Sequence, residues 1–310
     1  MIKYTLKRLL QLIPTLFVVS VIVFSMVRLI PGDPITLLYG ISDSGSADPE
    51  YLEFMREEYG LNDPIYIQYF NWIGNIFKGD LGISIVTHKP ISVELAKRYE
   101  STLILALGGT IVASFVGVAI GIIAAVFHNK FGDNLVMVFS MVAVSTPSFF
   151  LAMILMLIFS LYLGWLPSMG LKGWKYAILP IITLGLHAVG MIARTTRSSM
   201  LDVINQDYIR TSKSCGVPKL KIILAYSFKN ALIPILTAIG LRFGSLLAGA
   251  ALVETVFSIP GLGRFMVDGI SNRDYPVIQS TVLVFAVTFV LVNTVVDLLY
   301  GFVDPRVKYD

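Results

Sequence analysis

Six long apolar stretches constrain this chain more than any other feature of its sequence. A helix needs about 20 mostly apolar residues to cross the core of a bilayer. Only 14% of the residues are charged and 55% are hydrophobic, whereas about 25% of residues are charged in a soluble domain. Lipid cannot hold the charges that a water-facing surface needs. The sequence therefore predicts an all-α integral membrane protein with six transmembrane helices, at about 9–30, 101–127, 135–163, 177–198, 232–256 and 280–303.

The first stretch has the basic flank of a signal peptide, because Lys3, Lys7 and Arg8 precede it. Its run from 9 to 30 is nevertheless longer than the roughly 7–15 apolar residues of a signal peptide. It also ends in Pro-Gly-Asp-Pro at 31–34 rather than in a cleavage site of small residues. We therefore interpret residues 1–30 as an N-terminal segment and a retained first helix. Residues 31–100 then form an extracytoplasmic helical loop, and 101–310 form the core transmembrane domain.

Lysine and arginine indicate the orientation, since they collect on the cytoplasmic side of membrane proteins. With the N-terminus inside, the inner segments hold more of these residues than the outer segments, although the outer segments are longer. The inner segments are 1–8, 128–134, 199–231 and 304–310. Both termini are therefore predicted to be cytoplasmic. The third and fourth stretches contain Pro147 and Pro180, which membrane helices tolerate when neighbours satisfy the freed carbonyls.

Two connecting segments carry helix signals of their own. In the outer loop, Asp63 is an N-cap candidate, Pro64 fits a first helical position and Gly79 fits just past a helix end. In the inner segment 199–231, Asn205 is a cap candidate, Gly216 is a stop signal and Pro218 begins a second helix. Leu220, Ile223, Leu224 and Phe228 share one face of that second helix. The plainer alternative is an amphipathic link between the fourth and fifth spans.

The inner segment also resembles a known signature. Residues 207–216 read Asp-Tyr-Ile-Arg-Thr-Ser-Lys-Ser-Cys-Gly, and 229–234 read Lys-Asn-Ala-Leu-Ile-Pro. This is similar to the loop of permease subunits of binding-protein-dependent ABC importers, most of all the B-type subunit of dipeptide and oligopeptide systems. The general pattern begins Glu-Ala-Ala, whereas this chain has Arg210, Thr211 and Ser212, and Lys229 replaces a proline. The first departure narrows the resemblance to the peptide branch.

Further segments carry the resemblance over almost the whole length. They occur before and after the first span, in both outer loops and at the C-terminal end, in the order that the family shows. They are Tyr4 with Lys7 and Arg8, then 31–34, 59–64, 79–82, 259–263, 273–279 and 304–306.

The resemblance implies a transport subunit of the cell (plasma or inner) membrane that is not itself an enzyme. Its implied partners are a second, homologous permease in a heterodimer, two cytoplasmic ATPase subunits and an extracytoplasmic peptide-binding protein. ATP and Mg would be bound by the ATPases, with no cofactor in this chain and no nucleic acid. The implied cargo is a di- or oligopeptide; glutathione or a nickel chelate in the same machine remains an alternative.

In that family the inner loop forms a coupling helix that docks on the ATPase. The residues that would do so here are Asp207, Tyr208, Arg210, Thr211, Ser212, Lys213, Gly216, Val217, Pro218 and Lys219. The outer turn before the last span is a candidate for docking of the binding protein, against the alternative of a solvated loop face. Its residues are Pro260, Gly261, Gly263, Arg264, Arg273, Asp274 and Tyr275.

Charges and small residues inside the spans mark further candidates. Arg242, Ser245 and Gly249 of the fifth span are pathway or gating candidates, although Arg242 fits structural pairing equally well. Glu254 and Asp297 fit structural roles better. Small residues recur at Gly117 and Gly121 and again at Gly240 and Gly244, which suits close helix packing within the subunit or, alternatively, a dimer seam.

Several kinds of chemistry have no sequence support. The chain has no phosphate-binding Gly-x-x-x-x-Gly-Lys loop, one cysteine (Cys215), and three histidines, His88, His128 and His187, that are far apart. We therefore predict no metal site. The rival from another class is a stand-alone secondary transporter, which normally needs carboxylates or broken helices near the membrane midplane; only Asp297 approaches that description. A third class, a membrane-embedded enzyme, is not supported, because the sequence shows no pairing of a nucleophile with a base.

Overall fold

The computed structural model describes residues 2–28, 35, 41–42, 45–46, 48–58 and 60–303, with side chains for all of these except 2–9, 27, 41–42, 45–46, 58, 297 and 299–303. The segments around 31–34 and 304–306, Tyr59, and the side chains of Tyr4, Lys7, Arg8 and Asp297 lie outside the described part. The described backbone is almost entirely helical, apart from a short antiparallel pair, β1 (Ile41–Ser42) and β2 (Gly45–Ser46).

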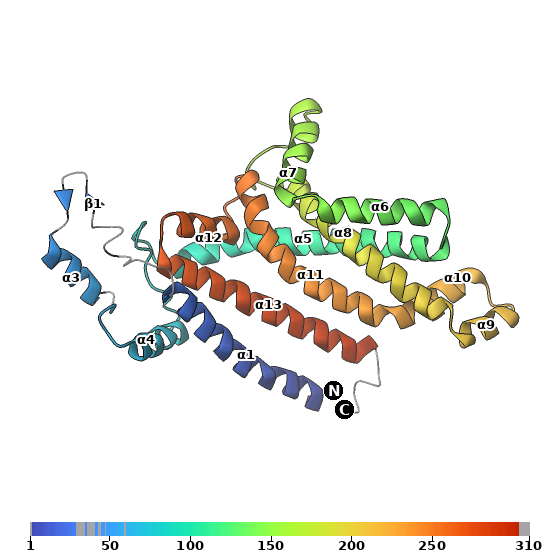
Figure 1. Ribbon diagram of the computed structural model, residues 1–310, viewed down its shortest axis with the longest axis horizontal. Coiled ribbons are helices and arrows are strands. Elements are labelled where there is room, and N and C mark those ends of the chain that lie inside the picture. Colours follow the sequence, from blue (N-terminus) through green and yellow to red (C-terminus); the bar gives the residue numbers. More distant parts are fainter. Residues whose placement is uncertain are drawn as a thin grey trace.

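The helices follow one another through the chain, and most of them run side by side (Figure 1). Their bounds are α1 (Ile2–Arg28), α3 (Pro49–Glu58), α4 (Ile65–Phe77), α5 (Ile91–Val126), α6 (Phe131–Ser145), α7 (Ser148–Met156), η1 (Leu157–Tyr162), α8 (Trp174–Ile204), α9 (Asp207–Ser214), α10 (Lys219–Lys221), η2 (Ile222–Phe228), α11 (Lys229–Val256), α12 (Leu262–Ser271) and α13 (Tyr275–Val303). The segments η1 and η2 are π-helical.

The all-helical membrane fold is confirmed, whereas the predicted count of six spans is not. Among the described residues, four helices are long and apolar enough to cross a bilayer: Ile91–Val126, Trp174–Ile204, Lys219–Val256 and Tyr275–Val296. A fifth is obtained if α6 and the α7–η1 helix are counted as one broken span. In α1, Leu10–Met26 forms a shorter apolar helix.

The third span is not the single helix that 135–163 suggested. Its two halves, Phe131–Ser145 and Ser148–Tyr162, are bent by 101°, so that α7 leans away from the neighbouring helices (Figure 1). The break falls at Thr146, whose ψ of 123° is extended, because the ring of Pro147 disfavours the helical conformation of the residue before it. By contrast, Pro180 lies inside the continuous helix α8.

The core forms where α8 packs between α5, α6, α7 and α11. Its buried apolar side chains include Leu105, Leu184, Ile192, Leu246 and Phe257. Glycines allow close approach: a Cβ on Gly121 would come within 2.6 Å of Ala193 and Thr196 in α8. Gly240 and Gly244 likewise face Val296 and Phe289 of α13. The small-residue stripes therefore pack within the subunit.

The outer-loop helix lies close to where Pro64 and Gly79 predicted it, but Asp63 does not cap it: Pro64 is the N-cap residue and no side chain caps the helix. Pro64 directly precedes α4, and Gly79 follows its end with a φ of 80°. Tyr69 packs edge-on against Phe24 of α1 at 5.4 Å between ring centroids, and its hydroxyl lies 2.8 Å from the Ser20 hydroxyl. The helix α5 begins at Ile91 rather than near 101, so it extends well into the predicted outer loop.

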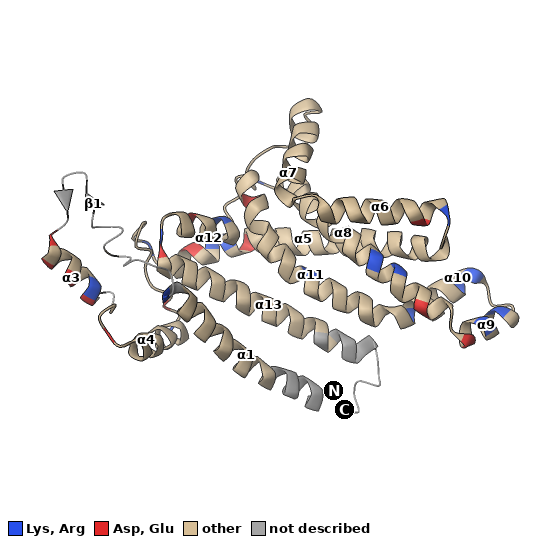
Figure 2. Ribbon diagram, in the orientation of Figure 1, with Lys and Arg blue, Asp and Glu red and all other residues tan. Residues whose placement is uncertain are grey.

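Charged residues gather at the two ends of the helices and leave the middle of the bundle apolar (Figure 2). One end holds α12, and the other holds the end of α8 together with α9 and α10 (Figure 2). The first turn of α1 and the last turn of α13 lie toward the α9 end (Figure 1). This distribution matches a slab of lipid between two polar surfaces.

Candidate coupling site

A helical turn projects from the bundle where α8 ends. The helix α9 is held by Ile209, which is fully buried, while the rest of the turn is mostly exposed. Asn205 does not cap α9 as predicted. It directly follows the last residue of α8 and has helical φ and ψ, and Gln206 precedes α9 without a side-chain cap. The hydroxyls of Thr211 and Ser212 bond to carbonyls four residues earlier, which satisfies them locally.

Gly216 makes the reversal between α9 and α10. Its φ is 77°, in the left-handed region that glycine adopts without a steric penalty, and no heavy atom outside the turn lies within 4 Å of a Cβ placed there. The N–H of Gly216 donates to the Lys213 carbonyl at 3.0 Å, and that of Val217 to Ser212 at 3.2 Å. These bonds close the C-terminal end of α9.

A π-helical segment joins the turn to the fifth span. Pro218 precedes α10, and α10, η2 and α11 form one helix over Lys219–Val256. The four residues predicted to share one apolar face do not do so. Leu220 and Leu224 are 68% and 50% exposed, whereas Ile223 and Phe228 are half-buried. The buried positions of this segment are Ile222 and Ser227. Their spacing of five residues follows the wider turn of a π-helix.

The exposed surface of the turn mixes apolar and basic side chains. Tyr208 is 44% exposed beside the two leucines, and Arg210, Lys213, Lys219 and Lys221 are exposed as well. The Tyr208 hydroxyl accepts a hydrogen bond from Asn230 Nδ2 at 3.0 Å. This contact fixes α9 against the beginning of α11. Of the predicted coupling residues, only Ser212 and Val217 are half-buried; the other eight are exposed.

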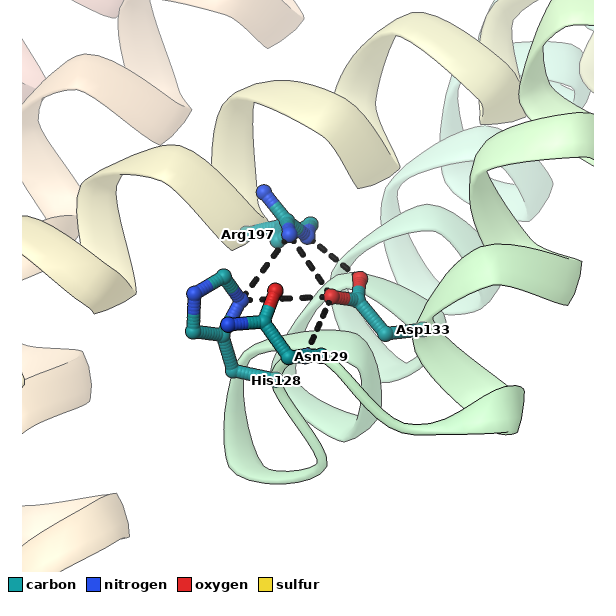
Figure 3. Close-up of polar contacts among 4 residues, drawn as sticks. All are labelled: His128, Asn129, Asp133 and Arg197. Atoms are coloured by element: carbon teal, nitrogen blue, oxygen red, sulfur yellow. Dashed lines mark hydrogen bonds and ion pairs between the residues drawn. The ribbon is translucent and has the colours of Figure 1, made fainter.

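A buried ion pair braces α8 seven residues before its end (Figure 3). Asp133, which is 1% exposed, accepts hydrogen bonds from Arg197 Nε and from Arg197 Nη2, the latter at 2.7 Å. The backbone N–H of Asn129 adds a bond of 3.0 Å, and His128 Nδ1 lies 3.0 Å from Arg197 Nη2. This cluster ties the α5–α6 turn to α8. It was not predicted, because 64 residues separate its two charged partners.

One face of α11 is not covered by any of the helices that the structure describes. Exposed positions recur every three or four residues along it, and several are small or polar: Pro234, Thr237, Leu241, Ser245, Ala248, Leu252 and Thr255. Arg242 and Gly249 are half-buried beside this stripe. Arg242 makes no ion pair or hydrogen bond with the described side chains, so the structural pairing considered for it has no partner there. We call this surface the α11 face.

At the opposite end of the bundle, a buried carboxylate holds α12 in place. Glu254 is fully buried and accepts hydrogen bonds from Thr102 Oγ1 at 2.6 Å and from the Arg264 N–H at 2.9 Å. Thr102 Oγ1 in turn accepts the Leu262 N–H at 2.7 Å. These bonds satisfy N–H groups that the first turn of a helix leaves unpaired. Glu254 therefore has the structural role that its sequence position favoured.

The outer turn divides into buried and accessible residues. Gly261, Gly263, Asp274 and Tyr275 are buried, and Asp274 accepts hydrogen bonds from Ser84 Oγ at 2.5 Å and from the Val86 N–H at 3.3 Å. Pro260 and Arg273 are exposed, and Arg264 is half-buried. A partner protein at this end would therefore meet the latter three side chains first.

Comparison with known proteins gives this arrangement a family. Residues 117–309 match the profile described as "Binding-protein-dependent transport system inner membrane component", and residues 1–106 match the profile of the N-terminal part of such components. The chain belongs to this family. It is a permease subunit of an ABC importer of the peptide type, a transport subunit rather than an enzyme, and a multi-pass protein of the inner membrane.

Relatives match this permease from end to end. It is 45% identical over 309 residues to the "Glutathione transport system permease protein GsiC" of Escherichia coli O6:H1, with 100% of each chain covered. The same identity and coverage hold for GsiC of Salmonella typhimurium.

Solved structures share the permease fold. An inward-facing methionine ABC transporter, MetNI, matches with a TM-score of 0.58 at 18% identity, over 68% of this chain and 96% of that chain. An amino acid ABC transporter matches with a TM-score of 0.50 at 16% identity, over 67% and 93%. Among the described residues of the permease, no three His, Cys, Asp or Glu side chains are placed to hold a metal ion.

Proposed function

We propose that this permease forms half of a pathway for short peptides, with a second homologous permease as the other half. Two cytoplasmic ATPase subunits, which bind ATP and Mg, would drive it, and an extracytoplasmic peptide-binding protein would deliver the cargo. The observation that carries the proposal is the projecting turn over 207–221, most of whose apolar and basic side chains are exposed. Exposed apolar groups ringed by polar ones are typical of a protein interface.

The turn is attached so that its movement would reach the pathway. Ile209 and the Tyr208–Asn230 bond anchor α9, and one helix runs from Lys219 into α11. Asp133 and Arg197 brace α8 against the neighbouring turn. An ATPase that pushed on the turn would therefore displace α11 relative to a braced α8. Ser212 to Leu220 would form the part in direct contact.

The α11 face is our candidate for the pathway wall. Its uncovered small and polar side chains, Ser245 among them, suit a water-filled path better than lipid. Arg242 and Gly249 lie beside this wall. The guanidinium of Arg242, which has no partner among the described side chains, complements the carboxylate that any peptide carries at its C-terminus.

We propose an orientation in which α9, α10 and both termini face the cytoplasm. The basic residues at the α9 end favour this side. The opposite end, with Pro260, Gly261, Gly263, Arg264, Arg273, Asp274 and Tyr275, would then receive the binding protein. Pro260, Arg264 and Arg273 would make the contact, while the buried members would shape the surface.

Glutathione is a second candidate for the cargo. GsiC of Escherichia coli O6:H1 and of Salmonella typhimurium, which match over the full length of this chain, carry its name. Glutathione is itself a tripeptide with two carboxylates, so it fits the same chemistry of recognition.

Uptake by the reconstituted complex tests the proposal. With ATP and the loaded binding protein, we expect the complex to accumulate a labelled dipeptide, glutathione, or both. If both are carried, each should inhibit uptake of the other. Replacing Gly216 with valine should abolish uptake and the retention of ATPase subunits, since a β-branched residue cannot easily hold a φ of 77°. Uptake by the permease alone, or full uptake by the G216V complex, would contradict it.

A further inference from the structure

A cavity of about 510 Å³ lies between α1, α12 and α13, apart from the α11 face. Its walls are apolar: Val23 and Met26 from α1, Met266 and Ile270 from α12, and Ile278 and Val282 from α13. Met26 and Ile270 are 59% and 54% exposed, so the cavity reaches the surface. The size is that of a ligand site rather than a packing defect.

The cavity lies on the lipid-facing edge of the bundle. The helix α1 runs along α13 there (Figure 1), and its large apolar side chains, Ile13, Phe17, Ile22 and Met26, are more than half exposed. A surface of this kind is in contact with acyl chains in a bilayer.

Three polar groups around the cavity have no partner among the residues that the structure describes. Arg273 is exposed, and its guanidinium makes no ion pair or hydrogen bond with the described side chains. Tyr275 is only 7% exposed, yet its hydroxyl is buried without a hydrogen-bond partner, and so is Gln279 Nε2. Buried polar groups in folded proteins are nearly always paired. All three residues line the cavity, which therefore combines apolar walls with a cation and two buried polar groups that have no partner among the described residues.

We infer that this cavity binds an anionic phospholipid. One acyl chain would fill the apolar part, the phosphate would pair with Arg273, and the Tyr275 hydroxyl and Gln279 amide would donate to headgroup or ester oxygens. Arginine favours phosphate because its planar guanidinium donates two parallel hydrogen bonds. A free anion would leave the apolar walls unused, and a neutral lipid would leave the cation unpaired. The outer leaflet is the source in the orientation proposed above; the site itself does not depend on that orientation.

Native mass spectrometry of the purified complex tests this inference. The probes are phosphatidylglycerol and phosphatidylcholine with identical acyl chains, added at equal concentration. We expect retention of phosphatidylglycerol in preference to phosphatidylcholine. Substituting Arg273→Gln should lower phosphatidylglycerol occupancy roughly tenfold, as expected when one charge-assisted contact is lost. Arg264→Gln, a matched change on the same side of the membrane but outside the cavity, should leave occupancy unchanged.

The comparison of the two lipids uses the wild-type protein alone, so it tests the inference even if the R273Q protein folds poorly. Equal retention of the two lipids, or equal occupancy in R273Q and R264Q, would overturn it. Displacement of the lipid by inorganic phosphate alone would overturn the role of the acyl chain. The readout is bound mass without transport, so failure of the uptake experiment and failure of this one are distinguishable.

Discussion

At the scale of single residues, the strongest contacts in this permease join positions that are far apart in the chain. Glu254 meets Thr102 across 152 residues, and Asp274 meets Ser84 across 190. Both carboxylates satisfy N–H groups near a helix start, α12 and α13 respectively. Buried charges in a membrane protein are costly unless they are bonded in this way. The α12 end of the bundle is therefore held together by a few polar side chains.

Removing the charge of Asp133 is expected to destabilise the permease. Asp133→Asn keeps the shape but leaves Arg197 without its anion, which should cost about 2 kcal/mol; breaking a fully buried pair costs roughly 3–5 kcal/mol, and the Arg197 side chain remains 20% exposed. Thermal unfolding of the purified complex measures the effect. Asp202→Asn, an exposed carboxylate near the end of the same helix, is the control. Equal melting temperatures for the two variants would show that the ion pair does not brace α8.

At the scale of elements, α5 and α8 approach closely because both helices carry glycine at the contact, Gly121 in α5 and Gly185 in α8 among them. Gly121→Ala should therefore destabilise the bundle by about 1–3 kcal/mol, the usual cost of overpacking. The nearest atom to a Cβ on Gly249 is 3.8 Å away, against 2.6 Å for Gly121, so Gly249→Ala should leave stability unchanged. Thermal unfolding or the yield of folded complex compares the two. A Gly121→Ala protein as stable as the Gly249→Ala protein would refute the packing argument.

The exposed apolar side chains of the projecting turn should make ATPase binding sensitive to an added charge. Leu220→Asp places a carboxylate in the surface where the ATPase is proposed to dock, and should weaken that contact by at least about 2 kcal/mol, as for a hot-spot residue. Copurification of the ATPase subunits measures the loss. Phe77→Asp changes a side chain that is 88% exposed at the other end of the molecule and should have no effect. If the L220D and F77D proteins retain equal amounts of the ATPase subunits, the docking surface does not include Leu220.

Local sequence rules predicted some elements and missed others for physical reasons. Pro64 and Gly79 bounded α4, and Gly216 marked the end of α9, because each acts through its own backbone. The break before Pro147 was missed because Pro180 has the same local effect but is accommodated inside α8. Which proline breaks a helix depends on neighbours that the local sequence does not specify. The Asp133–Arg197 pair was missed for the same reason.

At the scale of the whole molecule, the single cysteine gives a direct test of orientation. Cys215 is exposed at the projecting turn. A membrane-impermeant maleimide should label it from the cytoplasmic side only, and bound ATPase should protect it. In a Cys215→Ser background, Lys89→Cys, an exposed outer-loop position, should react only from the opposite side. Labelling of Cys215 from outside would invert the proposed orientation.

The uncovered α11 face also bears on how the cell keeps subunits in proportion. A subunit that has not yet assembled with its partner permease leaves the charge of Arg242 beside a surface open to hydrocarbon. Exposing that charge to lipid costs several kcal/mol or more. Such an orphan would be short-lived, because membrane quality control recognises misplaced charge. Degradation of the unassembled subunit would then match its abundance to that of its partner permease. In cells without the partner permease, a pulse-chase experiment should find that the Arg242→Leu subunit is degraded more slowly than the wild-type subunit.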